Sequence, residues 1–442
     1  METIDNIPTS KIKRASKIFS TGAKVGINYA KYYGNRLTKS KEEAKEVLDL
    51  ENADDIYDGL KSLKGSALKV AQMLSMDKNI MPRANVEKFS LSQFSVPPLS
   101  PALVVKTFRK YFGQGPDEIF DSFTPSSVHA ASIGQVHMAE KDGKKLAVKI
   151  QYPGVADSIS SDLALVKPIA MKMFNIKGEG SDQYFEEVRN KLLEETDYTL
   201  EVSQSKIIAE ACHELENIAF PKYYEDLSSS RIITMDWMDG LHLSEFAKVN
   251  KNPKLADQVG QALWDFYMFQ IHKLRMVQAD PHPGNFLVDQ KGTLLALDFG
   301  CIKHLPKDFY NPYFELASPE GLNNQQRFME LLYELEILKK GDTSQEIAFF
   351  SEMFHSILSL FVKPLQHETF SFTDHQFFEE ISALGEDYAR RTELRKMNGN
   401  RGSRHFIYMN RTFFGLYNLM FDLGARDVEM MKFVKTNMEE IN

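Results

Sequence analysis

Apolar residues recur at steps of three and four over long parts of the chain, a period that predicts amphipathic helices. The pattern is seen over residues 41–80, 101–113, 184–215 and 255–275. Most of the chain after residue 238 has the same helical character. We therefore expect helices at the start of the chain and a large helical region at its end.

Several segments between these helical regions have the composition of strands. SSVHAASIGQVHMAE, in a region that changes character at Ser127, and KKLAVKIQYPG are joined across Lys141-Asp142-Gly143, which is a strong hairpin signal. RIITMDWM at 231–238 predicts a further strand, and residues 286–297 predict a second hairpin. This order predicts a small β-containing lobe before a larger helical lobe.

Composition narrows the class of protein. With 442 residues, of which 43% are hydrophobic and 26% charged, the chain can bury a sizeable core in two or three domains. The two cysteines, Cys212 and Cys301, are too few for a disulfide framework and predict a reducing, cytoplasmic setting. No apolar run of membrane-spanning length occurs, and the net charge of -8 argues against nucleic acid as a partner.

The first 40 residues are locally basic. They hold eight lysines or arginines against two acids, and Ile12, Phe19 and Tyr29 lie among them. Such a segment can associate peripherally with an anionic membrane surface. The alternative is a simple capping segment, either packed on the body of the protein or disordered.

The segment QADPHPGNFLVDQKGTLLALDFG, residues 278–300, carries the strongest chemical signal. It contains Asp280, Asn285 at the spacing D-x-x-x-x-N, a short hairpin and then the D-F-G sequence that begins at Asp298. D-F-G alone would be a chance tripeptide, but the combined order and spacing argue against chance. We expect Asn285 and Asp298 to bind Mg²⁺ as hard oxygen ligands, and Asp280 to orient or deprotonate an attacking hydroxyl or water.

A phosphoryl-transfer site of this kind also needs a lysine on an upstream strand. LAVKIQ, which resembles the V-A-I-K pattern, provides Lys149, which otherwise would be a solvated edge residue. The expected partner is a helix carboxylate, and EETDYTLE offers Glu195, Asp197 and Glu201 close together. A solvated acidic helix face is the alternative interpretation of these three residues.

The glycine-rich loop of ordinary kinases is missing before Lys149. The segment AASIGQVH offers Ala130, Ala131, Ser132 and Gly134 as candidate nucleotide-binding residues instead. Alanines cannot bring the backbone as close to a phosphate as glycines can. Nucleotide handling of the ordinary protein-kinase type is therefore not expected.

With this loop, the chain resembles the UbiB/AarF family of atypical, protein-kinase-like proteins, which act around isoprenoid quinone biosynthesis. The resemblance rests on AASIGQVH, KIQYPG, EETDY, DPHPGNF and LDFG, and on LKGSALKVAQMLS at 63–75, which is similar to the K-x-G-Q helix of the family. It covers roughly residues 50 to 305 directly. Two departures are Ala71, where the family has glycine, and His129, which precedes only two alanines.

The resemblance implies roles for further residues. Lys69 and Gln72 would belong to a helix that folds over the nucleotide site, where Lys69 would face and gate the site with Glu195 and Asp197. Glu201 would pair with Lys149. A site covered in this way favours ATP hydrolysis, or transfer to a small or lipid-like acceptor, over phosphorylation of a protein.

Together these features predict an α+β, protein-kinase-like, two-lobe fold. We expect a basic segment over 1–48, a helical extension over 49–115, the N-lobe over 116–237 and the helical C-lobe over 238–442. Mg-ATP would bind between the lobes, with Lys149, Glu201 and Asp280 as catalytic residues and an isoprenoid or other lipid as a further ligand. The alternatives are a protein or small-molecule kinase and a nucleotide-sensing scaffold without turnover.

Overall fold

The structure is a computed structural model. It describes residues 98–131, 133–173, 181–390 and 401–434, and, near the start, positions 20, 24, 27–28, 30–35, 40, 43–44, 47–48, 51–52 and 55. The described residues form two compact units. Unit 1 consists of the chain up to Val202 together with Lys222–Trp237. Unit 2 consists of Ser203–Pro221 and the chain from Met238 onward.

The described positions near the start of the chain are mostly helical. The side-chain amide of Asn28 donates a hydrogen bond to Asp55 at 2.8 Å, and Lys24 lies 3.4 Å from the same carboxylate. Lys31 lies 3.4 Å from Glu51. Two of the basic residues near the start of the chain, Lys24 and Lys31, are therefore paired with carboxylates of the same chain.

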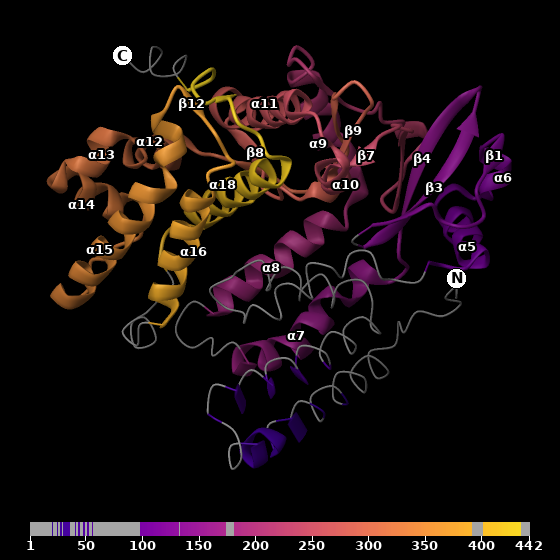
Figure 1. Ribbon diagram of the computed structural model, residues 1–442. Helices are drawn as coiled ribbons and strands as arrows, with labels where there is room; N and C mark the ends of the chain where they lie inside the picture. Colours follow the sequence, from indigo (N-terminus) through magenta and orange to yellow (C-terminus); the bar gives the residue numbers. More distant parts are fainter. Residues whose placement is uncertain are drawn as a thin grey trace. The chain divides into compact units, whose positions relative to one another are not determined.

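Unit 1 is built around an antiparallel sheet with the strand order β1-β3-β4-β6, in which β2 also pairs with β3. Its strands are β1 (Ser122–Phe123), β2 (His129–Ala130), β3 (Gly134–Lys141), β4 (Lys144–Gln151) and β6 (Ile232–Asp236). The long β3/β4 hairpin, visible in Figure 1, turns through Asp142 and Gly143, with φ of 50° and 72°. Two successive positive φ angles suit the twist of a two-residue hairpin, so the predicted turn is confirmed.

Helices precede and follow the strands of this sheet in the chain, and the last of them, α9, continues into unit 2. They are α5 (Pro101–Phe112), α6 (Pro116–Ile119), α7 (Val155–Met173), α8 (Ser181–Glu195) and α9 (Tyr198–Ala211), with a 3-10 turn η2 (Glu225–Leu227). The helix α5 stops at Gly113, which has φ of 74°, as the sequence predicted. The predicted helix over 184–215 is in fact two helices, and α7 was not identified from the sequence.

The start of β3 requires a glycine. A Cβ atom on Gly134 would lie 2.4 Å from the carbonyl oxygen of Ile150 in β4 and 3.1 Å from the hydroxyl of Tyr198 in α9. The first distance is far inside normal contact, and its partner is backbone that cannot turn aside. Any side chain at this position must therefore separate β3 from β4.

Unit 2 is mainly helical, and its short strands form small sheets. The sheet β5-β10-β9-β7 and the pairs β11-β8 and β12-β13 are found among the described residues. The strands are β5 (Ile218–Ala219), β7 (Leu241–His242), β8 (Met276–Gln278), β9 (Phe286–Val288), β10 (Leu294–Ala296), β11 (Ile302–His304), β12 (Thr369–Phe370) and β13 (Val428–Glu429). The pairing of β9 with β10 confirms the predicted second hairpin.

The helices of unit 2 surround a large aromatic core. They are α10 (Leu243–Val249), α11 (Pro253–Phe269), α12 (Lys307–Leu316), α13 (Pro319–Asn323), α14 (Gln325–Glu334), α15 (Ser344–Phe361), α16 (His375–Arg390) and α18 (Arg404–Leu423), with the turns η3 (Gln270–Leu274), η4 (Pro283–Asn285) and η5 (Lys363–Gln366). In Figure 1, α12 to α15 lie together, next to α16 and α18. None of the described helices is long and apolar enough to span a membrane.

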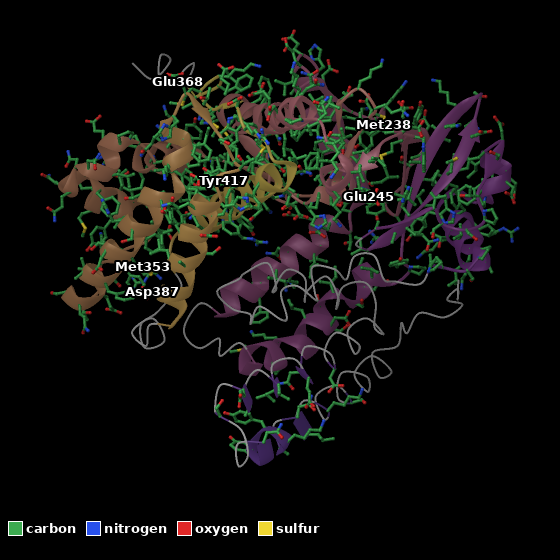
Figure 2. The ribbon with its side chains drawn as sticks, viewed as in Figure 1. Met238, Glu245, Met353, Glu368, Asp387 and Tyr417 are labelled. Carbon is green, nitrogen blue, oxygen red and sulfur yellow. The ribbon has the colours of Figure 1, made fainter. Side chains whose placement is uncertain are left out.

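The helices α11 and α18 form the centre of this core. Trp264 stacks on Tyr417, which Figure 2 labels, with ring centroids 6.4 Å apart. Gly260 lets the chain after α18 approach closely, because a Cβ atom there would lie 2.6 Å from the Cβ of Ala425. The helix predicted over 255–275 has the right extent, but its α-helical part ends at Phe269 and η3 continues it as a π-helix.

We predict that Gly134→Ala lowers the free energy of unfolding by about 1–3 kcal/mol, the usual cost of overpacking a tight contact. Urea unfolding of the full chain, followed by circular dichroism, measures the change. Gly143→Asn is the matched control, because nothing lies within 4 Å of its Cβ position and asparagine tolerates a positive φ. Equal stability of the two variants would contradict the close β3/β4 contact.

Candidate functional site

The centre of the unit 1 sheet contains a buried ion pair. Lys149 lies on β4 between Val136 of β3 and Ile233 of β6, so its strand is paired on both sides. Its Nζ atom lies 2.7 Å from Glu201 Oε1, and the two side chains are only 10% and 6% exposed. The structure therefore brings together two of the predicted catalytic residues, and the edge-strand interpretation of Lys149 does not apply.

The turn before α9 fixes Glu201 in this position. Asp197 accepts hydrogen bonds from the backbone N–H groups of Thr199 and Leu200 at 3.1 and 3.3 Å, which caps the helix. The carbonyl oxygen of Thr196 accepts from the Gln151 amide at 3.1 Å and from the Arg231 guanidinium. These bonds tie the start of α9 to the end of β4.

An aromatic ring completes the surroundings of the lysine. The Nζ atom of Lys149 lies 5.1 Å from the centroid of the Tyr198 ring, a cation–π distance. Tyr198 is fully buried and belongs to the first turn of α9. The lysine is therefore held by groups of one helix turn, which restrict it to one orientation.

The loop predicted to bind nucleotide forms a tight turn between β2 and β3. Ala131 N–H donates to the carbonyl oxygen of Gly134 at 3.0 Å, and Gly134 N–H donates back to Ala131 at 3.5 Å. Ala130 pairs with Gln135 in the sheet, and Ser132 lies outside the described residues. The two N–H groups of Ala131 and Gly134 are thus used within the turn, and the absence of a side chain at Gly134 already has a packing reason.

The predicted gate is only partly described. Lys69, Gln72 and the departure at Ala71 lie outside the described residues. Glu195, the last residue of α8, is buried, whereas the exposed Asp197 caps α9. His129, the other departure from the family pattern, stacks on Trp237 with ring centroids 5.9 Å apart.

In unit 2, backbone and side-chain bonds join Asp280 to Asn285. The side-chain nitrogen of Asn285 donates to the carbonyl oxygen of Asp280 at 2.9 Å. His282 stabilises the same loop, since its Nδ1 accepts from Gly284 N–H at 3.0 Å and its own N–H donates to Asp280 at 2.8 Å. His282 thus has a structural role in the turn.

The second hairpin brings Asn285 to Asp298. The N–H group of Leu297 donates to the carbonyl oxygen of Asn285 at 3.0 Å, which extends the β9/β10 pairing by one step toward Asp298. The Asp298 carboxylate accepts from Gly300 N–H at 2.9 Å. Phe299 is fully buried against Phe266, with ring centroids 6.1 Å apart, and anchors this segment.

These residues form a suitable donor set for Mg²⁺. The nitrogen of the Asn285 amide is bonded to the Asp280 carbonyl, so the oxygen is the end that can turn toward a cation. With Asp298 this gives two hard oxygen ligands, and Mg²⁺ typically takes few protein ligands and completes its shell with water and phosphate. Within the described ranges, no group of three or more histidine, cysteine or acidic side chains is arranged to hold a metal ion.

Three buried residues near the site were missed by the sequence analysis. The Gln278 side chain donates to the carbonyl oxygen of Asp298 and accepts from the Tyr267 hydroxyl at 3.1 Å. The backbone N–H of Gln278 donates to Gln270 Oε1 at 3.0 Å. Burial, with smaller contributions from the charges of Asp280 and Cys301, raises the pKa of Tyr267 well above its ordinary value, so its hydroxyl stays a donor. No local pattern distinguishes such residues from ordinary core positions.

A glycine in α18 also shapes the loop of Asp280. A Cβ atom on Gly415 would lie 2.4 Å from Cγ of Pro281. The helix therefore keeps open the space that the proline occupies beside Asp280. No local pattern in the sequence signals this contact, because Gly415 lies far along the chain in an otherwise ordinary helix.

Comparison with known proteins identifies relatives. A family described as the ABC1 atypical kinase-like domain matches residues 91–332, which is more than half of the chain. The probable serine/threonine-protein kinase abkA of Dictyostelium discoideum is 29% identical over 75% of this chain and 62% of its own. The atypical kinase coq-8, mitochondrial, of Caenorhabditis elegans is 30% identical over 70% of this chain and 42% of its own.

The chain matches only part of its curated relatives but nearly all of one protein of known structure. The chain spans between 36% and 62% of the first three curated relatives that it matches. The Mycobacterium tuberculosis protein Rv3197, solved as a complex with erythromycin, has a TM-score of 0.59 and covers 90% of this chain and 98% of its own at 23% identity. That likeness concerns the fold alone, and with the family match it confirms the expected α+β, kinase-like fold. The resemblance seen in the sequence motifs is confirmed as well: the chain belongs to the ABC1 atypical kinase-like family, which includes the UbiB/AarF-type proteins.

Proposed function

We propose that this protein binds Mg-ATP and either hydrolyses it or transfers its terminal phosphate to a small or lipid-like acceptor. The observation that carries the proposal is the buried contact of 2.7 Å between Lys149 and Glu201. A strand lysine held by a helix glutamate is the arrangement that orients a lysine toward the α and β phosphates of a nucleotide.

Stability alone does not explain this ion pair. Taking two charges out of water costs more than their attraction usually returns, so apolar residues of similar size would hold the fold as well or better. A buried pair is useful where a fixed positive charge must meet an anionic ligand, because its orientation then requires no reorganisation. The pair therefore favours a phosphate-binding role for Lys149.

Unit 2 would supply the remaining chemistry. Asn285 and Asp298 would hold Mg²⁺, and the metal would neutralise charge on the phosphates of the bound nucleotide. Asp280, whose backbone carbonyl is bonded to the Asn285 amide, would orient or deprotonate the attacking water or hydroxyl.

Family membership supports an ATP-using, kinase-type protein, and the UbiB/AarF resemblance suggests isoprenoid quinone metabolism or other lipid-related metabolism as the setting. Hydrolysis is our first choice, because the family resemblance implies that Lys69 and Gln72 cover the site. A protein or small-molecule kinase and a nucleotide-sensing scaffold are the alternatives.

Peripheral binding to anionic membranes is a further part of the proposal. Ile27 and Tyr33 near the start of the chain are 57% and 69% exposed, on a segment rich in basic residues. Exposed apolar side chains beside cations suit a membrane surface. The pairing of Lys24 and Lys31 with acidic residues weakens this attraction, so a modest effect of membranes is expected.

The first prediction is Mg-dependent ATP hydrolysis by the purified chain, stimulated by anionic liposomes. Asp298→Asn should lower turnover by about 10²-fold or more, because it removes the charged metal ligand. Release of phosphate, measured with and without liposomes, tests both statements. Nucleotide binding without turnover in either condition would instead favour the scaffold, and stoichiometric phosphorylation of a protein would favour the kinase.

The second prediction separates the function of the ion pair from its effect on stability. Glu201→Leu alone should destabilise the fold by about 3–5 kcal/mol, because it removes the carboxylate that lies 2.7 Å from the buried ammonium group of Lys149. The double variant Lys149→Met/Glu201→Leu should regain most of that stability while remaining inactive. Unfolding and ATP turnover are measured on the same preparations, and a double variant with native turnover would refute the phosphate-binding role.

A further inference from the structure

Gln278 lies between the segment that bears Asp280 and the segment that bears Asp298. It is the last residue of β8 and precedes Asp280 by two positions, and its side chain is only 2% exposed. The strand β8 pairs with β11, where Gln278 lies opposite Ile302. One step further, Ala279 N–H donates to the carbonyl oxygen of Cys301 at 2.8 Å. The segments that bear Asp280 and Asp298 are therefore joined through the ends of this strand pair.

The amide of Gln278 can take only one orientation. A backbone carbonyl can only accept, so the amide nitrogen must face the carbonyl oxygen of Asp298. The amide oxygen then accepts from the hydroxyl of Tyr267 at 3.1 Å. Tyr267 is itself fully buried in α11, and its hydroxyl keeps its proton because burial raises its pKa. The helix α11 thus sets the direction of the amide, and the amide sets the backbone of Asp298.

The backbone of Gln278 is fixed from the same helix region. Its N–H group donates to Gln270 Oε1 at 3.0 Å, and the nitrogen of the Gln270 amide donates to the carbonyl oxygen of Phe266. Each of these four hydrogen bonds between buried groups has a donor facing an acceptor. Such a network holds its members in one arrangement, because any rotation leaves a buried polar atom unsatisfied.

From this arrangement we propose that Gln278 is a positioning residue that sets the metal affinity of Asp298. By holding the peptide carbonyl of Asp298, Gln278 fixes the direction in which the carboxylate leaves the backbone. Gly300 N–H, at 2.9 Å from Oδ1, fixes the carboxylate on its other side. A metal ligand held by both ends needs no reordering when the cation binds, so its affinity is higher than that of a mobile carboxylate.

The inference rests on the proposed function, since it assigns a role within the same Mg-nucleotide site. A purely structural role would have a different consequence. Loss of a buried hydrogen bond would then lower stability and leave metal affinity unchanged in the protein that remains folded. Metal affinity is therefore the quantity that separates the two roles.

The experiment measures Mn²⁺ binding to the full chain in the presence of a non-hydrolysable ATP analogue, by electron paramagnetic resonance. Gln278→Met, which has a similar length but offers no donor to the Asp298 carbonyl, should weaken Mn²⁺ binding by about tenfold, the effect of losing roughly one hydrogen bond. Tyr267→Phe, which keeps Gln278 but removes the donor that orients it, should weaken binding by about threefold, a fraction of the same hydrogen-bond energy.

Thr412→Val is the matched control. It removes a buried hydroxyl of α18, which donates to the carbonyl oxygen of Tyr408 one turn earlier. Its stability should fall while its Mn²⁺ affinity stays native. Hydrogen exchange of the metal-free chain gives a second readout, in which the Gly300 amide should exchange faster in Gln278→Met and at the native rate in Thr412→Val.

The possible results distinguish failure of the positioning role of Gln278 from failure of the proposed Mg-nucleotide function. If the native chain binds Mn²⁺ and nucleotide but the Gln278 and Tyr267 variants bind Mn²⁺ equally well, the positioning role is wrong and the proposed function stands. If the native chain binds no Mn²⁺ with nucleotide, both are wrong. If Gln278→Met does not fold, Tyr267→Phe decides: native Mn²⁺ affinity in that variant overturns the inference, and weakened affinity upholds it.

Discussion

The burial of Lys149 against Glu201 is the constraint on which unit 1 depends. A cation in the middle of a sheet must be paired, so a helix has to present a carboxylate at that point of β4. The rest of the local structure serves this need. Asp197 caps the helix at the right place, and Gln151 and Arg231 hold the preceding turn to the sheet.

Unit 2 meets a related requirement in a different way. Uncharged groups hold the backbone of Asp298 there, because the Gln278 amide donates to its carbonyl oxygen and accepts from the Tyr267 hydroxyl. In the proposed function, unit 1 would supply the positive charge for phosphate, and unit 2 would supply the oxygen ligands for the metal.

The sequence predicted what short-range signals encode. The β3/β4 turn at Asp142-Gly143, the end of α5 at Gly113 and the order of the chemical motifs are local patterns, and they sufficed for the α+β fold and the family. The choice of Glu201 among three nearby carboxylates came from family resemblance, because residue type alone does not show where α9 begins. The need for a glycine at position 415 was missed because it comes from a contact with Pro281, which is close in space but distant in the chain.

The most direct test of this account is a crystal structure of the chain with Mn²⁺ and a non-hydrolysable ATP analogue, in which anomalous scattering locates the metal. The account predicts a Mn²⁺ peak bound by the Asn285 amide oxygen and the Asp298 carboxylate. A metal bound at other residues, or no metal peak in crystals that contain the nucleotide, would contradict the proposal that these two residues hold the metal.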